Sequence, residues 1–193
     1  MHRLFIAIRP PAEIRARLLA LSGNIAGARW QDDMQLHLTL RFVGEVDPHQ
    51  AQDLADALAL VNFTPFTIAL SGLGEFERKG RVDTIWAGVQ PRDIWAGVQP
   101  RDALTQLHQK VDRACVLAGL TAEERAYLPH ITLARLSRGA GSTRAFLEQN
   151  AGLSSPPFLI DRFGLFESHL GQSGAIYHQA AIYHAVPQSP EAI

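Results

Sequence analysis

Short runs along the chain alternate between hydrophobic and polar residues. A period of two is typical of strands, because successive side chains of a strand point to opposite faces of a sheet. The alternation predicts strands at RLFIAI (3–8), LHLTLRFVG (36–44), PFTIAL (65–70), HITLARL (130–136), FLIDRFGLFES (158–168) and AIYHQAAIYHAV (175–186). Between 74 and 84, the stretch GEFERKGRVDT predicts a hairpin with Gly80 at its turn.

Other segments repeat their hydrophobic residues at the spacing of a helix. The first follows Pro10-Pro11, which suits the first turn of a helix, and the second follows Asp47-Pro48, an N-cap and a first-turn proline. A third helix is expected to begin at Asp102 and end at Gly119, and a fourth, short one begins near Ser142. The residues expected on the buried faces of the first three are Ile14, Leu18, Leu21 and Ile25, then Leu54, Leu58 and Val61, then Leu104, Leu107, Val111 and Cys115.

The order of these elements is strand, helix, strand, helix, several strands, helix, strand, helix, strands. This order predicts an α+β fold with mainly antiparallel pairing, built as two similar halves that each carry one strand with a histidine two positions before a threonine. We expect residues 1–186 to form a single domain. The proline-rich end PQSPEAI, 187–193, is expected to be a flexible tail.

One nine-residue segment, IWAGVQPRD, occurs twice without change, at 85–93 and at 94–102. Two tandem copies are too few for a solenoid, which needs about three units. We therefore interpret the repeat as a local duplication that is functionally neutral. Only the second copy leads directly into the third helix, so 94–98 is the expected strand. The first copy would then loop out, or fold back on the second through a turn at 90–93.

Composition limits the classes of function. The formal net charge is −1, whereas proteins that bind long nucleic acids usually carry a strong basic excess, so a nucleic acid is expected to be bound at one end or one phosphate. The single cysteine excludes disulfides and cysteine zinc sites, and the histidines lack the spacing of a metal site. No run of about 18 hydrophobic residues is present, and the N-terminal stretch is not expected to be a signal peptide, because its hydrophobic part is too short. We expect a cytoplasmic monomer with no membrane partner, no obligate protein partner, no metal and no cofactor.

The motif His-x-Thr occurs twice, as HLTL at 37–40 and as HITL at 130–133, each time among hydrophobic residues. In a regular strand the histidine and the threonine share one face, and the residues between them face the core. From the composition, about 0.07 such flanked pairs are expected by chance. Either copy alone is consistent with an ordinary strand histidine, but two copies in matching contexts indicate a shared role.

A pair of histidines suits proton transfer on both sides of one reacting centre. Histidine gives or takes a proton near neutral pH, so one ring can act as general base and the other as general acid. A threonine hydroxyl beside each ring can donate a hydrogen bond to a negatively charged phosphate oxygen. Hydrolysis of a cyclic phosphodiester uses these groups and needs no metal. Because the motifs are nearly symmetric, the residues alone leave open which histidine is the acid.

The two HxTx motifs resemble those of the 2H phosphoesterases. The stretches RLFIAI, LHLTLRFVGEV, IWAGV before a helix, LPHITLAR and FGLFESHLGQSGAIY are similar to the LigT-like RNA 2′,3′-cyclic phosphodiesterases, in the same order and over most of the chain. The resemblance implies two pseudo-symmetric lobes, each an antiparallel sheet with flanking helices, with the active-site cleft between them. It implies hydrolysis of an RNA-terminal 2′,3′-cyclic phosphate to a 2′-phosphomonoester, and joining of RNA halves through a 2′–5′ bond as a related activity. It also implies that His37 is the proton donor and His130 the proton acceptor.

Several residues near the motifs are candidates for contacts with the phosphate. Thr39 and Thr132 are expected to hold its oxygens. Arg41 shares the face of His37 in a regular strand and is expected to neutralise phosphate charge, unless it only reaches solvent.

Other candidates rank lower. On regular alternation Arg135 points away from the second histidine and Phe42 points into the core. The cluster Arg78-Lys79-Gly80-Arg81 lies at the expected hairpin tip, where it either contacts RNA backbone or is merely solvated. Tyr127 is expected in the core or at the rim of the site.

Two alternatives remain to the RNA phosphodiesterase. The chain could act on another small cyclic phosphate or cyclic nucleotide. It could also be a module that binds a nucleotide or an RNA end without turnover, in which case binding would occur without product formation.

Overall fold

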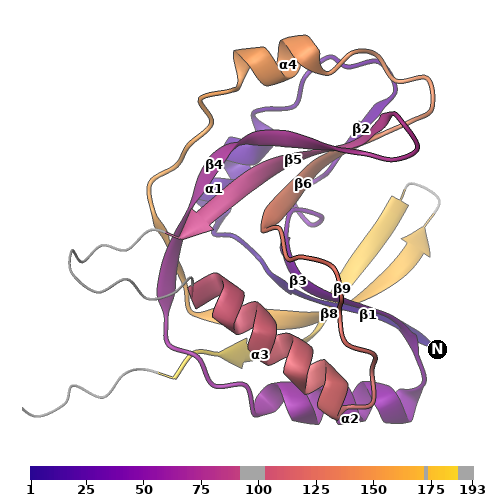
Figure 1. The fold of residues 1–193 in the computed structure, drawn as a ribbon, viewed down its shortest axis with the longest axis vertical. Coiled ribbons are helices and arrows are strands. Elements are labelled where there is room, and N and C mark those ends of the chain that lie inside the picture. Colours follow the sequence, from indigo (N-terminus) through magenta and orange to yellow (C-terminus); the bar gives the residue numbers. More distant parts are fainter. Residues whose placement is uncertain (92–102, 172–173, 187–193) are drawn as a thin grey trace, which may run out of the picture.

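The computed structural model describes residues 1–91, 103–171 and 174–186. Figure 1 shows the arrangement of its helices and strands. The helices of this part are α1 (Ala12–Leu19), α2 (Pro48–Ala59), α3 (Ala103–Leu117) and α4 (Arg144–Gln149), and none is long and apolar enough to cross a membrane. The strands are β1 (His2–Ile8), β2 (Ala28–Trp30), β3 (Leu38–Val46), β4 (Phe66–Glu77), β5 (Val82–Pro91), β6 (His130–Leu136), β7 (Phe158–Ile160), β8 (Arg162–Gly171) and β9 (Gly174–His184).

The strands form a sheet in which each pair of neighbours is antiparallel. Its order is β7-β4-β5-β6-β3-β1-β8-β9, and β2 pairs with β6 outside this path. Little pairing joins the middle of the sheet: the register of β3 with β6 is the residue pair Leu38 and Ile131. This joint divides the fold into a half with β1, β3, β8 and β9 and a half with β4 to β7. The predicted α+β fold with two antiparallel halves is confirmed.

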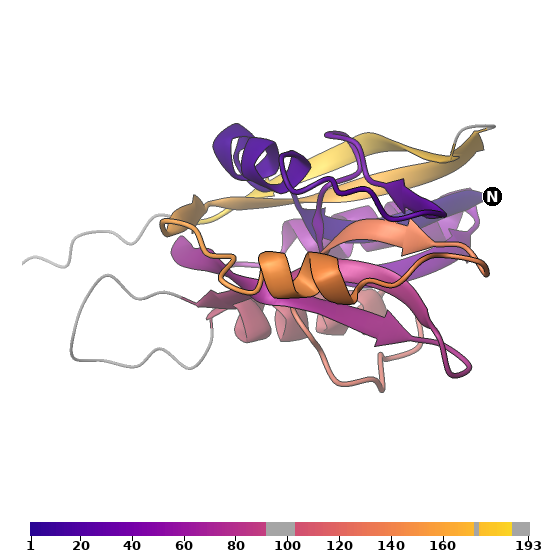
Figure 2. The ribbon, with the colours of Figure 1, turned by 90° about the horizontal axis from the view of Figure 1, so that it is seen from above.

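The helices lie on both sides of this sheet. In Figure 1, α2 and α3 lie beside the half that contains β1, β8 and β9, and α4 lies at the far edge of the other half. Figure 2 shows α1 and α3 on opposite sides of the strands. The ring of Phe146 on α4 contacts that of Trp30 on β2, with 5.1 Å between ring centroids.

The ends of α2 and α3 follow from the predicted capping residues. The Asp47 carboxylate accepts a hydrogen bond of 2.9 Å from the backbone N–H of Gln50, and Pro48 occupies the first turn of α2. At the end of α3, Gly119 has φ +82°, which disfavours other residues. The N–H of Leu120 donates to the carbonyl of Cys115 at 3.0 Å, the contact of a Schellman motif. Both predicted termini are confirmed, whereas Asp102, the expected start of α3, lies outside the described residues.

The first helix is shorter than its periodicity predicts. It ends at Leu19, and Leu21 and Ile25 pack against the core from the following loop. Cys115 is fully buried on α3, and burial raises the pKa of its thiol to about 11. The expectation that Cys115 lies on the buried face of this helix is therefore confirmed.

The expectation that the first copy of IWAGVQPRD loops out is wrong. Residues 85–91 of this copy lie in β5, which pairs with β4 on one side and β6 on the other. The reason is the tight hairpin: β5 starts at Val82, so looping out at Ile85 would break the pairing with β4 directly after the turn. Residues 92–102, with the strand expected at 94–98, lie outside the described residues, as does the tail expected at 187–193.

Candidate active site

The joint between the two halves brings the two His-x-Thr motifs together. His37 immediately precedes β3 and His130 is the first residue of β6, and the residues that follow them, Leu38 and Ile131, are paired across the joint. Both of these hydrophobic residues are fully buried. The histidines and threonines of both motifs point the other way and line one cavity of about 390 Å³. The sequence-predicted set of two histidines and two threonines is therefore assembled in one place.

Both imidazole rings are held in the same orientation by a backbone carbonyl. Nδ1 of His37 lies 2.7 Å from the carbonyl oxygen of Gln35, and Nδ1 of His130 lies 2.7 Å from that of Leu128. A carbonyl oxygen can only accept, so Nδ1 of each ring carries the hydrogen. In the neutral form each Nε2 then keeps a free lone pair. The two rings thus present equivalent proton-accepting atoms.

Aromatic rings surround both histidines. His37 lies between Phe5, with a centroid distance of 4.8 Å, and Tyr177, at 5.3 Å and nearly perpendicular. On the other side, Phe76 and Trp86 lie 4.8 and 6.0 Å from the ring of His130. These apolar walls reduce the contact of both rings with water, which disfavours a charged imidazole.

Burial lowers the pKa of both histidines. It brings the pKa of His37 to about 4 and also lowers the pKa of His130, and the positive charge of Arg135 acts in the same direction. Both rings are therefore neutral at pH 7 in the free protein. A negatively charged group between them would raise both pKa values, because it favours the imidazolium form.

The two motif strands contain matching irregularities. On β1, Ala7 pairs with Thr39 and Ile6 pairs with Arg41, so the intervening residue of β3 has no partner. On β5, Trp86 pairs with Thr132 and Ile85 with Ala134, which leaves one residue of β6 without a partner. In each strand this β-bulge follows the threonine and inverts the alternation of the next two residues; in β3 a second irregularity, between Phe42 and Gly44, comes after them.

The bulge in β3 exchanges the expected positions of Arg41 and Phe42. Arg41 does not line the cavity of the two histidines; its guanidinium lies 3.0 Å from carboxylate oxygens of both Asp112 and Glu123. Phe42 lines the cavity instead and is 56% exposed. The predictions that Arg41 shares the face of His37 and that Phe42 points into the core are both wrong, because they assumed a regular strand.

The bulge in β6 brings Arg135 into the cavity. The sequence placed this side chain on the opposite face from the second histidine, and the structure corrects that prediction. Its Nη1 donates a hydrogen bond of 2.8 Å to Oγ1 of Thr84, a buried residue that in turn donates to Asp83 at 2.8 Å. Arg135 is thereby fixed within the cavity as a positive charge.

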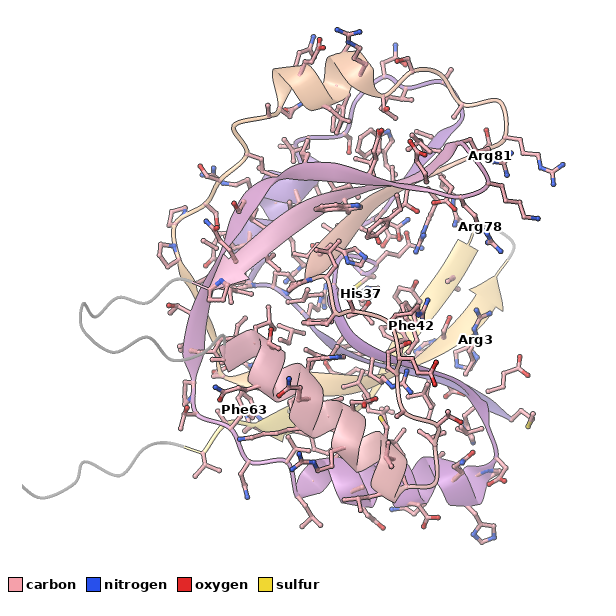
Figure 3. All side chains as sticks on the ribbon, in the orientation of Figure 1. Arg3, His37, Phe42, Phe63, Arg78 and Arg81 are labelled. Carbon is pink, nitrogen blue, oxygen red and sulfur yellow. The ribbon has the colours of Figure 1, made fainter. Side chains whose placement is uncertain are left out.

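Further lining residues come from strands distant in the sequence. Arg3 of β1, Arg29 of β2 and Tyr177 of β9 line the same cavity. Figure 3 shows His37, Phe42 and Arg3 around this region. No pattern in the sequence links these strands to the motifs, and only their positions in the sheet identify them. The cavity thus combines two histidines, two threonines and three arginines.

A second cavity of about 730 Å³ adjoins the first. Thr39, Phe42 and His130 line both. The second is also lined by apolar side chains and by four charged ones, those of Arg41, Glu77, Glu123 and Arg125. Tyr127 lines it with its ring stacked on that of His108, at 4.0 Å and 6° between planes. Tyr127 therefore lies at the rim of the site, as expected. Across residues 1–91, 103–171 and 174–186, no group of three or more His, Cys, Asp or Glu side chains could hold a metal ion.

Comparison with known families matches residues 10–172 to the 2′-5′ RNA ligase superfamily. A protein of Thermotoga maritima named RNA 2′,3′-cyclic phosphodiesterase is 30% identical over 183 residues, which cover 91% of this chain and 91% of that protein. A protein of Geobacillus stearothermophilus with the same name is 28% identical over 172 residues, covering 86% of this chain. The match spans 52% of the Geobacillus protein, about half its length.

Among solved structures, E. coli LigT complexed with 3′-AMP has the same fold. The two superpose with a TM-score of 0.72 and 25% sequence identity, over 96% of this chain and 98% of LigT.

Proposed function

Because this chain belongs to the 2′-5′ RNA ligase superfamily, we propose that it hydrolyses 2′,3′-cyclic phosphodiesters at the ends of RNA. The observation that carries this proposal is the arrangement of His37 and His130, whose Nε2 atoms are left free by matching Nδ1 contacts beside one cavity. The names of the Thermotoga and Geobacillus relatives support the choice of substrate.

In the proposed reaction a water molecule attacks the phosphorus atom. Nε2 of His130 takes a proton from this water, the bond between phosphorus and the ribose 3′ oxygen breaks, and Nε2 of His37 gives a proton to that oxygen. The product is a 2′-phosphomonoester. The hydroxyls of Thr39 and Thr132 and the guanidinium of Arg135 hold the non-bridging oxygens, whose negative charge grows in the transition state.

The roles of the two histidines follow the family resemblance. Burial lowers the pKa of His37 to about 4, so as a donor it depends on the substrate phosphate to raise its pKa before it holds a proton at neutral pH. A substrate whose 3′ oxygen is replaced by sulfur tests this assignment, since a thiolate leaves without protonation. The sulfur substrate should restore activity to His37→Ala and not to His130→Ala. If the sulfur substrate restored activity to His130→Ala alone, His130 would be the proton donor and His37 the acceptor.

Phosphorus NMR of an RNA oligonucleotide ending in a 2′,3′-cyclic phosphate, in the presence of EDTA, tests the function itself. We expect conversion to the 2′-phosphomonoester and a loss of about 10²–10⁴-fold when either histidine is replaced by alanine. His49→Ala, an exposed histidine on α2, is the matched control and should keep the full rate. Binding of the oligonucleotide without any product would instead support a module that only binds RNA ends.

The second cavity supports ligation as a second candidate function. It adjoins Thr39 and His130 and is large enough for a nucleoside, so the 5′ hydroxyl of a second RNA could take the place of water. The same bond between phosphorus and the ribose 3′ oxygen then breaks, the 5′ oxygen bonds to phosphorus in place of water, and the product has a 2′–5′ linkage beside a free 3′ hydroxyl. Incubation of a cyclic-ended RNA with a 5′-hydroxyl RNA, analysed for joined product, tests this activity.

A further inference from the structure

The tip of the β4–β5 hairpin concentrates positive charge that the protein itself does not neutralise. Arg78, Lys79 and Arg81 are all exposed, and none forms an ion pair within the described residues. Elsewhere among the described residues, several arginines do form ion pairs with carboxylates: Arg9, Arg15, Arg41, Arg125, Arg144 and Arg162. In a chain of net charge −1, the tip is thus a local excess of cations.

The turn holds two of these cations side by side. Lys79 and Gly80 have φ of +54° and +74°, as the two central residues of a type I′ turn require. The N–H of Arg78 donates to the carbonyl of Arg81 at 2.8 Å, so the two arginines flank the turn at opposite positions of the hairpin. Like charges in directly opposite positions destabilise a hairpin. An anion bound between them would relieve this repulsion.

The residues that lead into the tip line the second cavity of the site. Phe76 and Glu77, at the end of β4, line the second cavity together with His130. Beyond the turn, Arg81 lines a smaller cavity of about 290 Å³ with Arg138, which is also exposed. In Figure 3, Arg78 and Arg81 extend from the tip on the same side of the molecule as Arg3. The tip therefore places unpaired positive charge directly after the residues of β4 that line the second cavity.

We propose that the β4–β5 tip, with Arg138 beside it, binds the backbone phosphates of the RNA strand whose terminal cyclic phosphate occupies the cavity. This inference rests on the proposed function, because it needs the RNA end to lie at the two histidines. The strand leaves the cavity past Phe76 and passes the tip, where Arg78 and Arg81 contact its phosphates. Glu77 and Asp83 flank the tip, and the side chain of Asp83 accepts a hydrogen bond from Thr84.

The consequence is a dependence on substrate length. A 2′,3′-cyclic mononucleotide has no further phosphates and does not reach the tip, whereas a cyclic-ended pentanucleotide does. The variant Arg78→Ala/Arg81→Ala should lower kcat/KM for the pentanucleotide about ten-fold at low salt and leave the mononucleotide unchanged. Each lost phosphate contact should also reduce the slope of log binding constant against log salt by about 0.7.

A matched control removes the same charge elsewhere. Arg113→Ala/Arg144→Ala takes two exposed arginines from α3 and α4, and this variant should behave as the wild type on both substrates. The variant Arg78→Lys/Arg81→Lys should recover most of the lost activity, since phosphate attraction needs only the charge. Equal losses in the tip and control variants, or no loss with the pentanucleotide, would overturn the inference.

Failure of the proposed function would look different. In that case the wild type would hydrolyse neither substrate, and the tip would be tested by binding instead. Fluorescence anisotropy of a labelled pentanucleotide with a 2′-phosphate end should show weaker binding by Arg78→Ala/Arg81→Ala than by the control variant. Equal binding by the two variants would reject the tip as an RNA site.

Discussion

The burial of His37 should make the stability of the protein depend on pH below neutrality. Its pKa is about 4 in the folded chain, against 6.5 for an ordinary histidine. Each pKa unit corresponds to about 1.4 kcal/mol, so the folded protein disfavours the charged ring by roughly 3 kcal/mol. Between these two pKa values the unfolded chain binds a proton that the folded chain does not. The stability that the protein gains from this lowered pKa is therefore complete above pH 6.5 and is lost as the pH falls toward 4.

His37→Asn isolates this effect. The asparagine amide can still donate to the carbonyl of Gln35, as Nδ1 of the histidine does, but it does not titrate. Lowering the pH from 7.5 to 5 should cost the wild type about 2 kcal/mol through this one group. We expect the variant to lose about 2 kcal/mol less than the wild type over the same interval.

Urea unfolding followed by circular dichroism, at both pH values and for both proteins, measures the difference. Other titrating groups are common to the two proteins and cancel in the comparison. A difference within about 0.5 kcal/mol of zero, or one of opposite sign, would refute the inference that burial keeps His37 neutral.

Three further predictions follow from the geometry around the site. Arg41→Met leaves the Asp112 carboxylate without its ion-pair partner and Glu123 with Arg125 alone, and it should lower the unfolding free energy by about 3 kcal/mol, measured by urea unfolding. Hydrolysis of a cyclic mononucleotide should stay within two-fold, and a large loss of turnover in the folded variant would show that Arg41 acts at the phosphate. Gly74→Ala places a methyl group 2.2 Å from the ring of Trp86. It should lower the free energy of unfolding by about 1–3 kcal/mol and therefore the midpoint of thermal unfolding. An unchanged midpoint would contradict this close contact. Deletion of 94–102 leaves one copy of IWAGVQPRD and should preserve folding and activity, and loss of activity in a folded protein would show that the duplication has a function.

The sequence could predict the sheet-forming segments and the central set of the site, because both depend on local pattern. Alternation identifies most of the strands, although it misses the short β2 and most of β5. The repeated motif identifies His37 and His130 before any pairing is known. The pairing of Leu38 with Ile131 then explains why the two motifs meet. The two motifs meet because both strands must bury their hydrophobic faces in the same core.

The remaining site residues depend on interactions between distant segments. A bulge moves one residue out of register, and nothing in HLTLRF or HITLAR marks it; it is defined by pairing with β1 and β5. The errors for Arg41 and Arg135 have this common cause. Arg3 and Tyr177 enter the cavity only through the order of the strands. The two copies of IWAGVQPRD are identical, so only the closure of the hairpin distinguishes them.

The matching bulges have a consequence for how a substrate is oriented. Each places the residue five positions after its histidine at the cavity, and these residues are Phe42 in one half and Arg135 in the other. The near-symmetric pair of histidines is thus flanked by an uncharged aromatic ring on one side and a permanent cation on the other. A nucleotide is itself unequal in the same way, with a flat base at one end and a phosphate at the other. The backbone has the same bulge in both halves, but the side chains that follow it, Phe42 and Arg135, differ. The two ends of the cavity are therefore unequal, and a substrate can fit in one orientation better than in its reverse.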